Sequence, residues 1–339
     1  MWRVVTIGLC LVLCATEQAQ AVPHAQANAA LRARAERLLA RGRNAQAATL
    51  LQRAYTRAPT LELALKLARA SLPEPDGLLQ LQPSGPKRSN LDERALTVLA
   101  LVDALPAPSS AADQQALRDL FRLRAWALAL RDDFAGATAA LRERGARGDA
   151  QSARYLRGVA TLAALKDDLA SAESALLVAR NFMPEDADLA GDLGAVQLAQ
   201  GRAEEASIVW EERLRLDVRL DAKRDLASAL LAAGRAKEAW LLLEAERAAC
   251  DAAPDCALEA ARAALELGDH QASANRLAGT FVADPITTQF LLADALTRMG
   301  AKQRAREAYG RILAIKPANV RASENLRALD EPAQESTAK

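Results

Sequence analysis

The side chains best suited to catalysis or metal binding are few in this chain. It has two histidines, His24 and His270, and neither has a Cys, Asp or Glu neighbour at the spacing of a metal site. The sequence contains neither a glycine-rich phosphate loop nor a nucleophile elbow. The adjacent carboxylates Glu204 and Glu205 fit a solvated helix face better than an acid–base pair. We therefore expect a protein that is not an enzyme and that uses no cofactor and no metal.

A disulfide is the second chemical possibility. The segment "AACDAAPDCA" places Cys250 and Cys256 on either side of a proline-containing turn. An even pair this close together is typical of a disulfide in an oxidising compartment, and two buried thiols are the alternative. A redox role is disfavoured because C-x-x-C spacing is absent.

The composition indicates an all-α chain without a strongly charged partner. Of the 339 residues, 51% are hydrophobic but only 4% are aromatic, so Ala, Leu and Val supply most of the apolar content. Strong helix formers therefore dominate, and strand-favouring residues are scarce. The formal net charge of +1 gives no global electrostatic case for nucleic acid or for an anionic membrane.

A phrase repeats at a fixed period. Residues 200–210 read "QGRAEEASIVW", and residues 233–243 read "AGRAKEAWLLL". We take the alanine of this phrase, Ala206 and Ala239, as the marker slot. Seven such markers occur along the chain, and successive markers are 90, 35, 34, 33, 34 and 32 residues apart. The marker slot holds Ala47, Ala137, Ala172, Ala206, Ala239, Ser273 and Ala305. The large slot, four residues later, holds Leu51, Leu141, Leu176, Trp210, Leu243, Leu277 and Tyr309. The small slot, twelve residues before the marker, holds Ala35, Ala125, Ala160, Gly194, Ala227, Ala261 and Ala293. The turn slot, five residues before the marker, holds Gly42, Asp132, Asp167, Gly201, Gly234, Gly268 and Gly300.

Each slot has a physical role. Small residues on two helices let the helices approach closely, and the large residue fills the gap against the neighbouring repeat. Gly or Asp in the turn slot supplies a helix C-cap or a turn. The period therefore predicts a helix, a turn, a second helix and a second turn in each repeat.

This pattern resembles the tetratricopeptide repeat (TPR) family, whose unit has 34 residues with two small slots. The resemblance covers residues 28–61 and 118–319, although the tryptophan that the family carries near the start of the first helix is absent. It implies an all-α, right-handed superhelical solenoid of antiparallel helix pairs. It also implies that the first helix of each pair lines a concave groove that binds a partner.

The inward slots of that groove are candidate partner-binding positions. They hold Arg32, Arg122, Trp126, Arg157, Arg224, Arg262 and Phe290. A basic groove with aromatic anchors would suit an extended or helical segment that carries carboxylates. The alternative is that these are scattered solvated residues without a shared role.

The step of 90 residues between the first two markers indicates a degenerate repeat. Residues 60–72 and 91–105 are expected to be helical, with Asn90 as an N-cap and with Ala95 and Leu99 in the marker and large slots. Residues 73–90 are rich in Pro, Gly and Ser and are predicted to form a long loop. The expected divisions are an N-terminal repeat (22–61), the degenerate repeat (62–113), six repeats (114–319), a capping helix (320–330) and a flexible tail (331–339).

Residues 1–21 have the features of a cleavable signal peptide. The run "VVTIGLCLVLC" is too short to cross a bilayer as a helix, and Ala19-Gln20-Ala21 has the form of a cleavage site. This segment predicts export to the bacterial periplasm. Lipoprotein anchoring at Cys14 is the less favoured alternative, because a small residue is usual where Leu13 stands.

Together these observations predict an exported, non-enzymatic scaffold. It would bind protein partners in a multi-component envelope or outer-membrane assembly, without nucleic acid and without a membrane span in the mature chain. A polysaccharide-binding module of an export system is the alternative.

Overall fold

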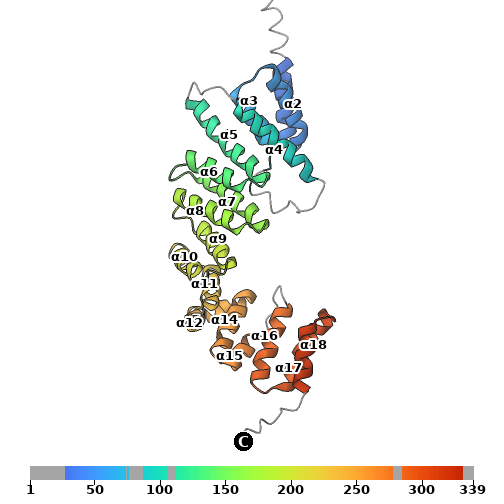
Figure 1. Ribbon diagram of the computed structural model, residues 1–339, viewed down its shortest axis with the longest axis vertical. Coiled ribbons are helices and arrows are strands. Elements are labelled where there is room, and N and C mark those ends of the chain that lie inside the picture. Colours follow the sequence, from blue (N-terminus) through green and yellow to red (C-terminus); the bar gives the residue numbers. More distant parts are fainter. Residues whose placement is uncertain (1–26, 74, 76–86, 105–110, 278–284, 331–339) are drawn as a thin grey trace, which may run out of the picture. The chain divides into compact units, whose positions relative to one another are not determined.

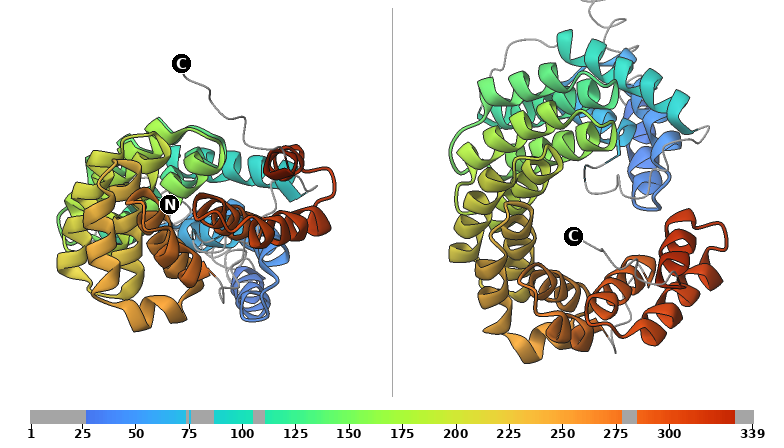
Figure 2. Two further views of the ribbon diagram at one scale, coloured as in Figure 1. Left: turned by 90° about the horizontal axis from the view of Figure 1, so that it is seen from below. Right: turned by 60° about the horizontal axis from the view of Figure 1, so that its bottom comes forward.

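A computed structural model describes residues 27–73, 75, 87–104, 111–277 and 285–330. The leader, the C-terminal tail and most of the expected long loop lie outside these ranges. The chain divides into two compact bodies, Met1–Pro184 and Glu185–Lys339 (Figure 1). In each body, helices that are consecutive in the sequence pack side by side (Figure 2).

The described part of the first body contains four helix pairs. The first pair is formed by residues 27–39 and α2 (Asn44–Arg57), and the second by α3 (Leu61–Ser71) and α4 (Lys87–Asp103). The third and fourth pairs are α5 (Ala111–Leu130) with α6 (Phe134–Arg144), and α7 (Ala150–Leu165) with α8 (Leu169–Phe182).

The second body continues the same arrangement. Its pairs are α9 (Ala187–Ala199) with α10 (Ala203–Leu216), α11 (Leu220–Ala232) with α12 (Ala236–Glu244), α14 (Pro254–Glu266) with α15 (His270–Leu277), and α16 (Pro285–Arg298) with α17 (Lys302–Ile315). A short helix, α13 (Arg247–Ala252), stands between α12 and α14, and α18 (Val320–Asp330) packs on α17 at the end. The capping helix that the sequence predicts is therefore present.

The turn inside the seven pairs that the period identifies has one conformation. The residue in the turn slot has a positive φ, between 63° and 80°, in all seven repeats that the period identifies. The next residue donates its backbone N–H to the carbonyl five residues before it, at 2.7–3.0 Å. This is the Schellman ending of a helix, and it requires a left-handed residue. Gly fills the slot five times, and Asp132 and Asp167 adopt the same strained conformation.

The slots also account for the core. The marker residues are all fully buried, and the small-slot residues are buried as well. In the large slot the most exposed member, Tyr309, is only 5% exposed. Gly194 shows how close the helices come, because a Cβ at this position would lie 2.5 Å from Nε1 of Trp210. The predicted role of the period in packing two helices together is confirmed.

The degenerate pair differs from its prediction in three details. α3 begins after Thr60, as expected, and Thr60 accepts a hydrogen bond from the Leu63 backbone N–H at 3.3 Å. α4 begins at Lys87 rather than after Asn90, so residues 87–90 are helical instead of part of the predicted loop and Asn90 is not an N-cap. Lys and Arg are good helix formers and extend the helix backwards. Ala95 is fully buried, but Leu99 is only half-buried because Val98 occupies the core position.

We expect Asp167→Gly to stabilise the protein. Glycine adopts a positive φ without the steric cost that Asp167 bears, so the free energy of unfolding should rise by about 0.5–1 kcal/mol. Gly201→Ala is the matched control and should lower the free energy of unfolding. A Cβ at this position would meet no atom within 4 Å, so the change strains only the backbone. Urea unfolding of both variants measures the effect. A less stable Asp167→Gly would show that the turn slot is not strained.

We expect Trp210→Ala to cost about 3–5 kcal/mol of unfolding free energy, as for other large core side chains. Trp210 is 4% exposed and donates its indole N–H to the Gly191 carbonyl at 3.1 Å. Ile208→Ala is the control, because Ile208 lies on the same helix but is 64% exposed. Thermal and urea unfolding should separate the two variants clearly. Equal losses would contradict the assigned core.

Candidate functional site

A hollow lies on the first helices of three successive pairs in the first body. Its volume is about 330 Å³, and residues of α3, α5 and α7 line it. The lining residues are Arg69, Gln115, Asp119, Arg122, Leu123, Gln151, Arg154 and Tyr155. Because the helices come from different pairs, the repeat stacking itself creates this hollow.

Positive charge dominates the hollow. Three arginines line it, and Asp119 is the one carboxylate among its lining residues. Arg69 Nη2 lies 2.7 Å from Asp119 Oδ2, and the Arg69 side chain is still 55% exposed. An arginine so exposed can exchange this partner for a carboxylate of a ligand at little cost, since surface ion pairs are weak. The hollow is therefore suited to bind an anionic group.

Arg122 has a different role from the one predicted. It is only 9% exposed, so it is not the exposed groove arginine that the sequence predicts. Its guanidinium lies 2.6 Å from Asp119 and 2.9 Å from Asp149, and its Nε donates to the Ser152 hydroxyl at 3.0 Å. Asp149 is the N-cap of α7, so Arg122 joins α5 to the start of the next pair.

The same contacts act on the Asp149 carboxyl. Burial opposes its ionisation, but the hydrogen bonds from Ser152 and Arg122 more than offset this effect, and its pKa lies below the usual range. Asp149 therefore stays charged as a partner for Arg122. This ion pair links α5 to the start of α7, and Arg122 is the member of the pair that lines the hollow.

Trp126 is not an exposed anchor either. It is fully buried, and its indole N–H donates to the Pro73 carbonyl at 2.8 Å. Its ring meets Tyr155 edge-on, with centroids 6.3 Å apart. A Cβ on Gly158 would lie 2.8 Å from Pro75 and 3.1 Å from Trp126. The chain that leaves α3 thus packs against Trp126, and the prediction of a groove anchor is wrong for this reason.

The other predicted groove residues do not line this hollow. Arg157 is exposed on α7, and Arg32 is half-buried on the first helix. In the second body, Phe290 is half-buried and meets Tyr309 edge-on at 6.1 Å, with the Arg321 guanidinium 4.9 Å from its ring centroid.

Arg224 and Arg262 both have acidic partners. Arg224 lies 2.6 Å from Asp225 and 4.0 Å from Asp255, and Arg262 lies 2.8 Å from Glu259. Burial raises the pKa of the Glu259 carboxyl, although Arg262 opposes the shift. The first helices of the second body therefore mix both charges, which the expectation of a continuous basic groove did not include.

Sequence reasoning missed Arg69, Arg154 and the acidic partners. Arg69 lies in the degenerate pair, where the period gives no register. The acidic partners do have a signal in the period. Three residues before the slot that holds Arg122 and Arg224, the sequence has Asp119 and Asp221, and two other pairs have Asp188 and Asp255 at the same slot. This row of aspartates predicts ion pairs along the first helices.

Two more buried arginines join neighbouring helices of the second body. Arg213 of α10 contacts Asp225 and lies 3.0 Å from Asp221, both on α11. Arg276 of α15 contacts Glu244 of α12 and lies 2.5 Å from Asp251 of α13. Together with Arg122, they link successive helix pairs through charged groups inside the stack.

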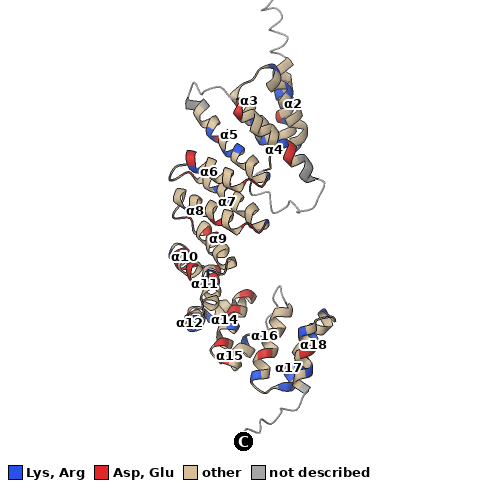
Figure 3. Cartoon of the chain, viewed as in Figure 1, with Lys and Arg blue, Asp and Glu red and all other residues tan. Residues whose placement is uncertain are grey.

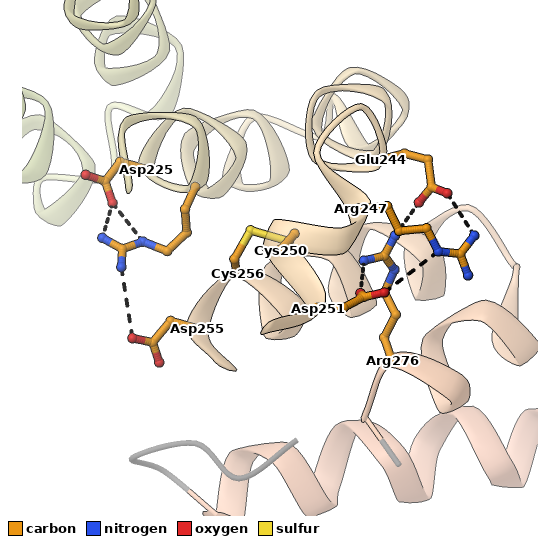
Figure 4. Close-up of a disulfide and its surroundings, with 9 residues drawn as sticks. Asp225, Glu244, Arg247, Cys250, Asp251, Asp255, Cys256 and Arg276 are labelled. Atoms are coloured by element: carbon orange, nitrogen blue, oxygen red, sulfur yellow. Dashed lines mark hydrogen bonds and ion pairs between the residues drawn. A yellow bond between two sulfur atoms is a disulfide. The ribbon is translucent and has the colours of Figure 1, made fainter. Parts of the chain in front are cut away.

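The structure joins Cys250 of α13 and Cys256 of α14 in a disulfide, as the sequence predicts (Figure 4). Both cysteines are buried, at 0% and 1% exposure. Glu244, Arg247, Asp251 and Arg276 form a group of ion pairs beside it. The disulfide and these ion pairs hold the broken second helix of this repeat against the next pair.

We expect loss of this disulfide to destabilise the chain by about 2–3 kcal/mol, the chain-entropy value for a short loop. Mild reduction should lower the melting temperature, and Cys250→Ala with Cys256→Ala should reproduce the loss without reductant. Peptide mapping after thiol labelling should find neither cysteine labelled in the oxidised protein. Labelling of both without reductant would contradict the pairing.

Neither a metal site nor a membrane span is found in the part of the chain that the structure describes. Across those residues, no three His, Cys, Asp or Glu side chains are grouped to hold a metal ion. The same residues form no helix that is long and apolar enough to cross a bilayer.

Helix pairs with a period of 32–35 residues, left-handed inner turns and paired small slots define an all-α helical-repeat fold with the period of the tetratricopeptide pattern. No family model matches the sequence, and no curated protein matches it.

Several solved structures are similar to this chain. MamA (residues 41 to the end) from Desulfovibrio magneticus RS-1 is 18% identical with a TM-score of 0.45, and the match covers 52% of this chain and 99% of that one. YrrB, described as a TPR protein with an unusual peptide-binding site, is 17% identical with a TM-score of 0.44 over 56% of this chain and 97% of that one. The C-terminal part of a TPR protein from Cytophaga hutchinsonii is 14% identical with a TM-score of 0.48, and the match covers 87% of this chain and 99% of that one.

Proposed function

We propose that this chain is a non-enzymatic scaffold that binds another protein through the hollow on α3, α5 and α7. The observation that carries the proposal is the presence of Arg69 and Arg154 in that hollow beside one lining carboxylate, Asp119, while Arg122 is held by its own ion pairs. Arginine forks bind carboxylates in a bidentate geometry, so an acidic segment of a partner suits the site. Tyr155 and Leu123 add apolar surface beside the charges.

The cellular setting is part of the same proposal. The signal-like residues 1–21 support export, with a mature chain that starts at Val22 and resides in the periplasm. A disulfide in the structure suits an oxidising compartment. The scaffold would then serve a multi-component assembly of the envelope or outer membrane.

The test removes positive charge from the hollow without changing Arg122. Arg69→Gln with Arg154→Gln should lower recovery of an acidic partner from envelope extract by about tenfold, and recovery by the unchanged protein should fall as salt rises. Arg304→Gln with Arg311→Gln on α17 is the matched control, because these arginines are exposed and lie in the other body. The control should recover the partner normally.

Equal recovery by all three proteins would contradict a role for the hollow. The alternative function, binding of an acidic polysaccharide, is tested with alginate as the probe. Binding of alginate that is lost with Arg69→Gln and Arg154→Gln, in the absence of any recovered protein, would favour that alternative.

A further inference from the structure

In each pair, one face of the first helix packs against the preceding pair. The residues thirteen, ten and nine positions before the marker lie on this face. In α11 they are Leu226, Ala229 and Leu230, which share one core cluster with Trp210 of the preceding pair. In α16 the same positions hold Leu292, Ala295 and Leu296, which share a cluster with Leu277 of the preceding pair. Among the other first helices these positions are mostly apolar, although Arg124 of α5 lies 3.4 Å from Asp103 of α4 and α9 carries Gln197.

The first pair carries different residues on this face. The equivalent positions hold Arg34, Arg37 and Leu38. The two arginines are exposed, and Leu38 is half-buried. The face is hollowed over about 600 Å³, a volume that is large enough to receive several side chains. The residues that line it are Arg34, Arg37, Leu38, Arg41, Arg43, Gln46, Thr49 and Leu50. We call this surface the end face.

The charge of the end face is of one sign. Residues 27–60 contain seven arginines, no lysine and one acidic residue, Glu36, whereas the whole chain has a formal net charge of +1. Within the described ranges, the guanidinium groups of Arg34, Arg37, Arg41 and Arg43 have neither a hydrogen bond nor an ion pair. The positions of the charged residues can be followed in Figure 3.

A polar end cap alone does not account for this surface. The terminal repeat of a solenoid needs a polar outer face, and mixed charges supply one without self-repulsion. At the other end of the chain, α18 covers α17 with the buried residues Ala322 and Leu329. The end face instead keeps two half-buried leucines, Leu38 and Leu50, among unpaired arginines. The two leucines form an apolar floor and the arginines form a charged rim, and this combination is typical of a docking surface.

We propose that an acidic amphipathic helix of another protein docks on the end face, in the place where a preceding repeat would pack. Its apolar ridge would cover Leu38 and Leu50, and its flanking carboxylates would pair with Arg34, Arg37, Arg41 and Arg43. The occupant is a helix because the same face receives a helix in the later pairs. This surface is separate from the hollow on α3, α5 and α7.

The test uses a synthetic helical peptide with leucines spaced three and four residues apart and flanked by glutamates. A peptide of the same composition in permuted order has no apolar ridge and serves as the peptide control. Arg37→Glu with Arg41→Glu should weaken binding of the amphipathic peptide by about tenfold or more. Arg53→Glu with Arg57→Glu changes the net charge of the same helix pair equally, outside the end face, and should have a much smaller effect. Arg69→Gln with Arg154→Gln removes charge from the hollow and should weaken peptide binding much less than Arg37→Glu with Arg41→Glu, which distinguishes this site from the proposed function.

Four results would overturn the proposal. The unchanged protein could fail to bind the peptide, or the permuted peptide could bind equally well, which would indicate a response to charge alone. The melting temperature of Arg37→Glu with Arg41→Glu could fall in the absence of peptide, which would indicate a partner within the chain. Vesicles of phosphatidylglycerol could bind the end face when the peptide does not, which would indicate a lipid surface.

Discussion

The close approach of the two helices in each pair is the constraint on which the rest of the structure depends. The marker and small slots face each other across that contact, and only residues without a long side chain fit there. The large slot of the same pair also needs a small neighbour, because a methyl group on Gly194 would collide with the indole ring of Trp210. The left-handed turn completes the constraint, because it reverses the chain within two or three residues. Trp210 in the large slot then contacts α9 of its own pair and packs in one core cluster with Leu226 and Leu230 of the next pair.

Charged groups inside the stack then set the order in which pairs pack. Three buried arginines form ion pairs between helix pairs. Arg122 of α5 pairs with Asp149 at the start of α7, Arg213 of α10 pairs with Asp221 of α11, and Arg276 of α15 pairs with Asp251 of α13. A buried arginine is costly when its partner is absent, so a wrong neighbour would leave the charge unpaired. Apolar alanine-rich faces alone would distinguish poorly between one pair and another. The ion pairs supply a specificity that the small slots lack.

The period predicted the fold because it reports contacts that recur identically in every repeat. The turn slot is an example: Gly and Asp share the ability to adopt a positive φ, and the sequence shows both residues there. Trp126 and Arg122 were misjudged because their burial depends on features that do not recur. Pro73 covers the first, and the N-cap Asp149 pairs with the second. The sequence did not predict a role for Arg69, because the period gives no register in the degenerate pair. It did not predict α13 either, because a break in one helix leaves the spacing of the markers unchanged.

The six-residue separation of Cys250 and Cys256 has a consequence for how the protein matures. Chain segments of this length meet within tens of nanoseconds, long before distant parts of a polypeptide come together. The correct partner of each thiol is therefore the first one it encounters, whatever the state of the remaining repeats. Oxidation can precede assembly and limit the conformations open to the nascent junction between α13 and α14. A crosslink that is local in this sense needs little help from an isomerase, because its two cysteines are close neighbours in the sequence.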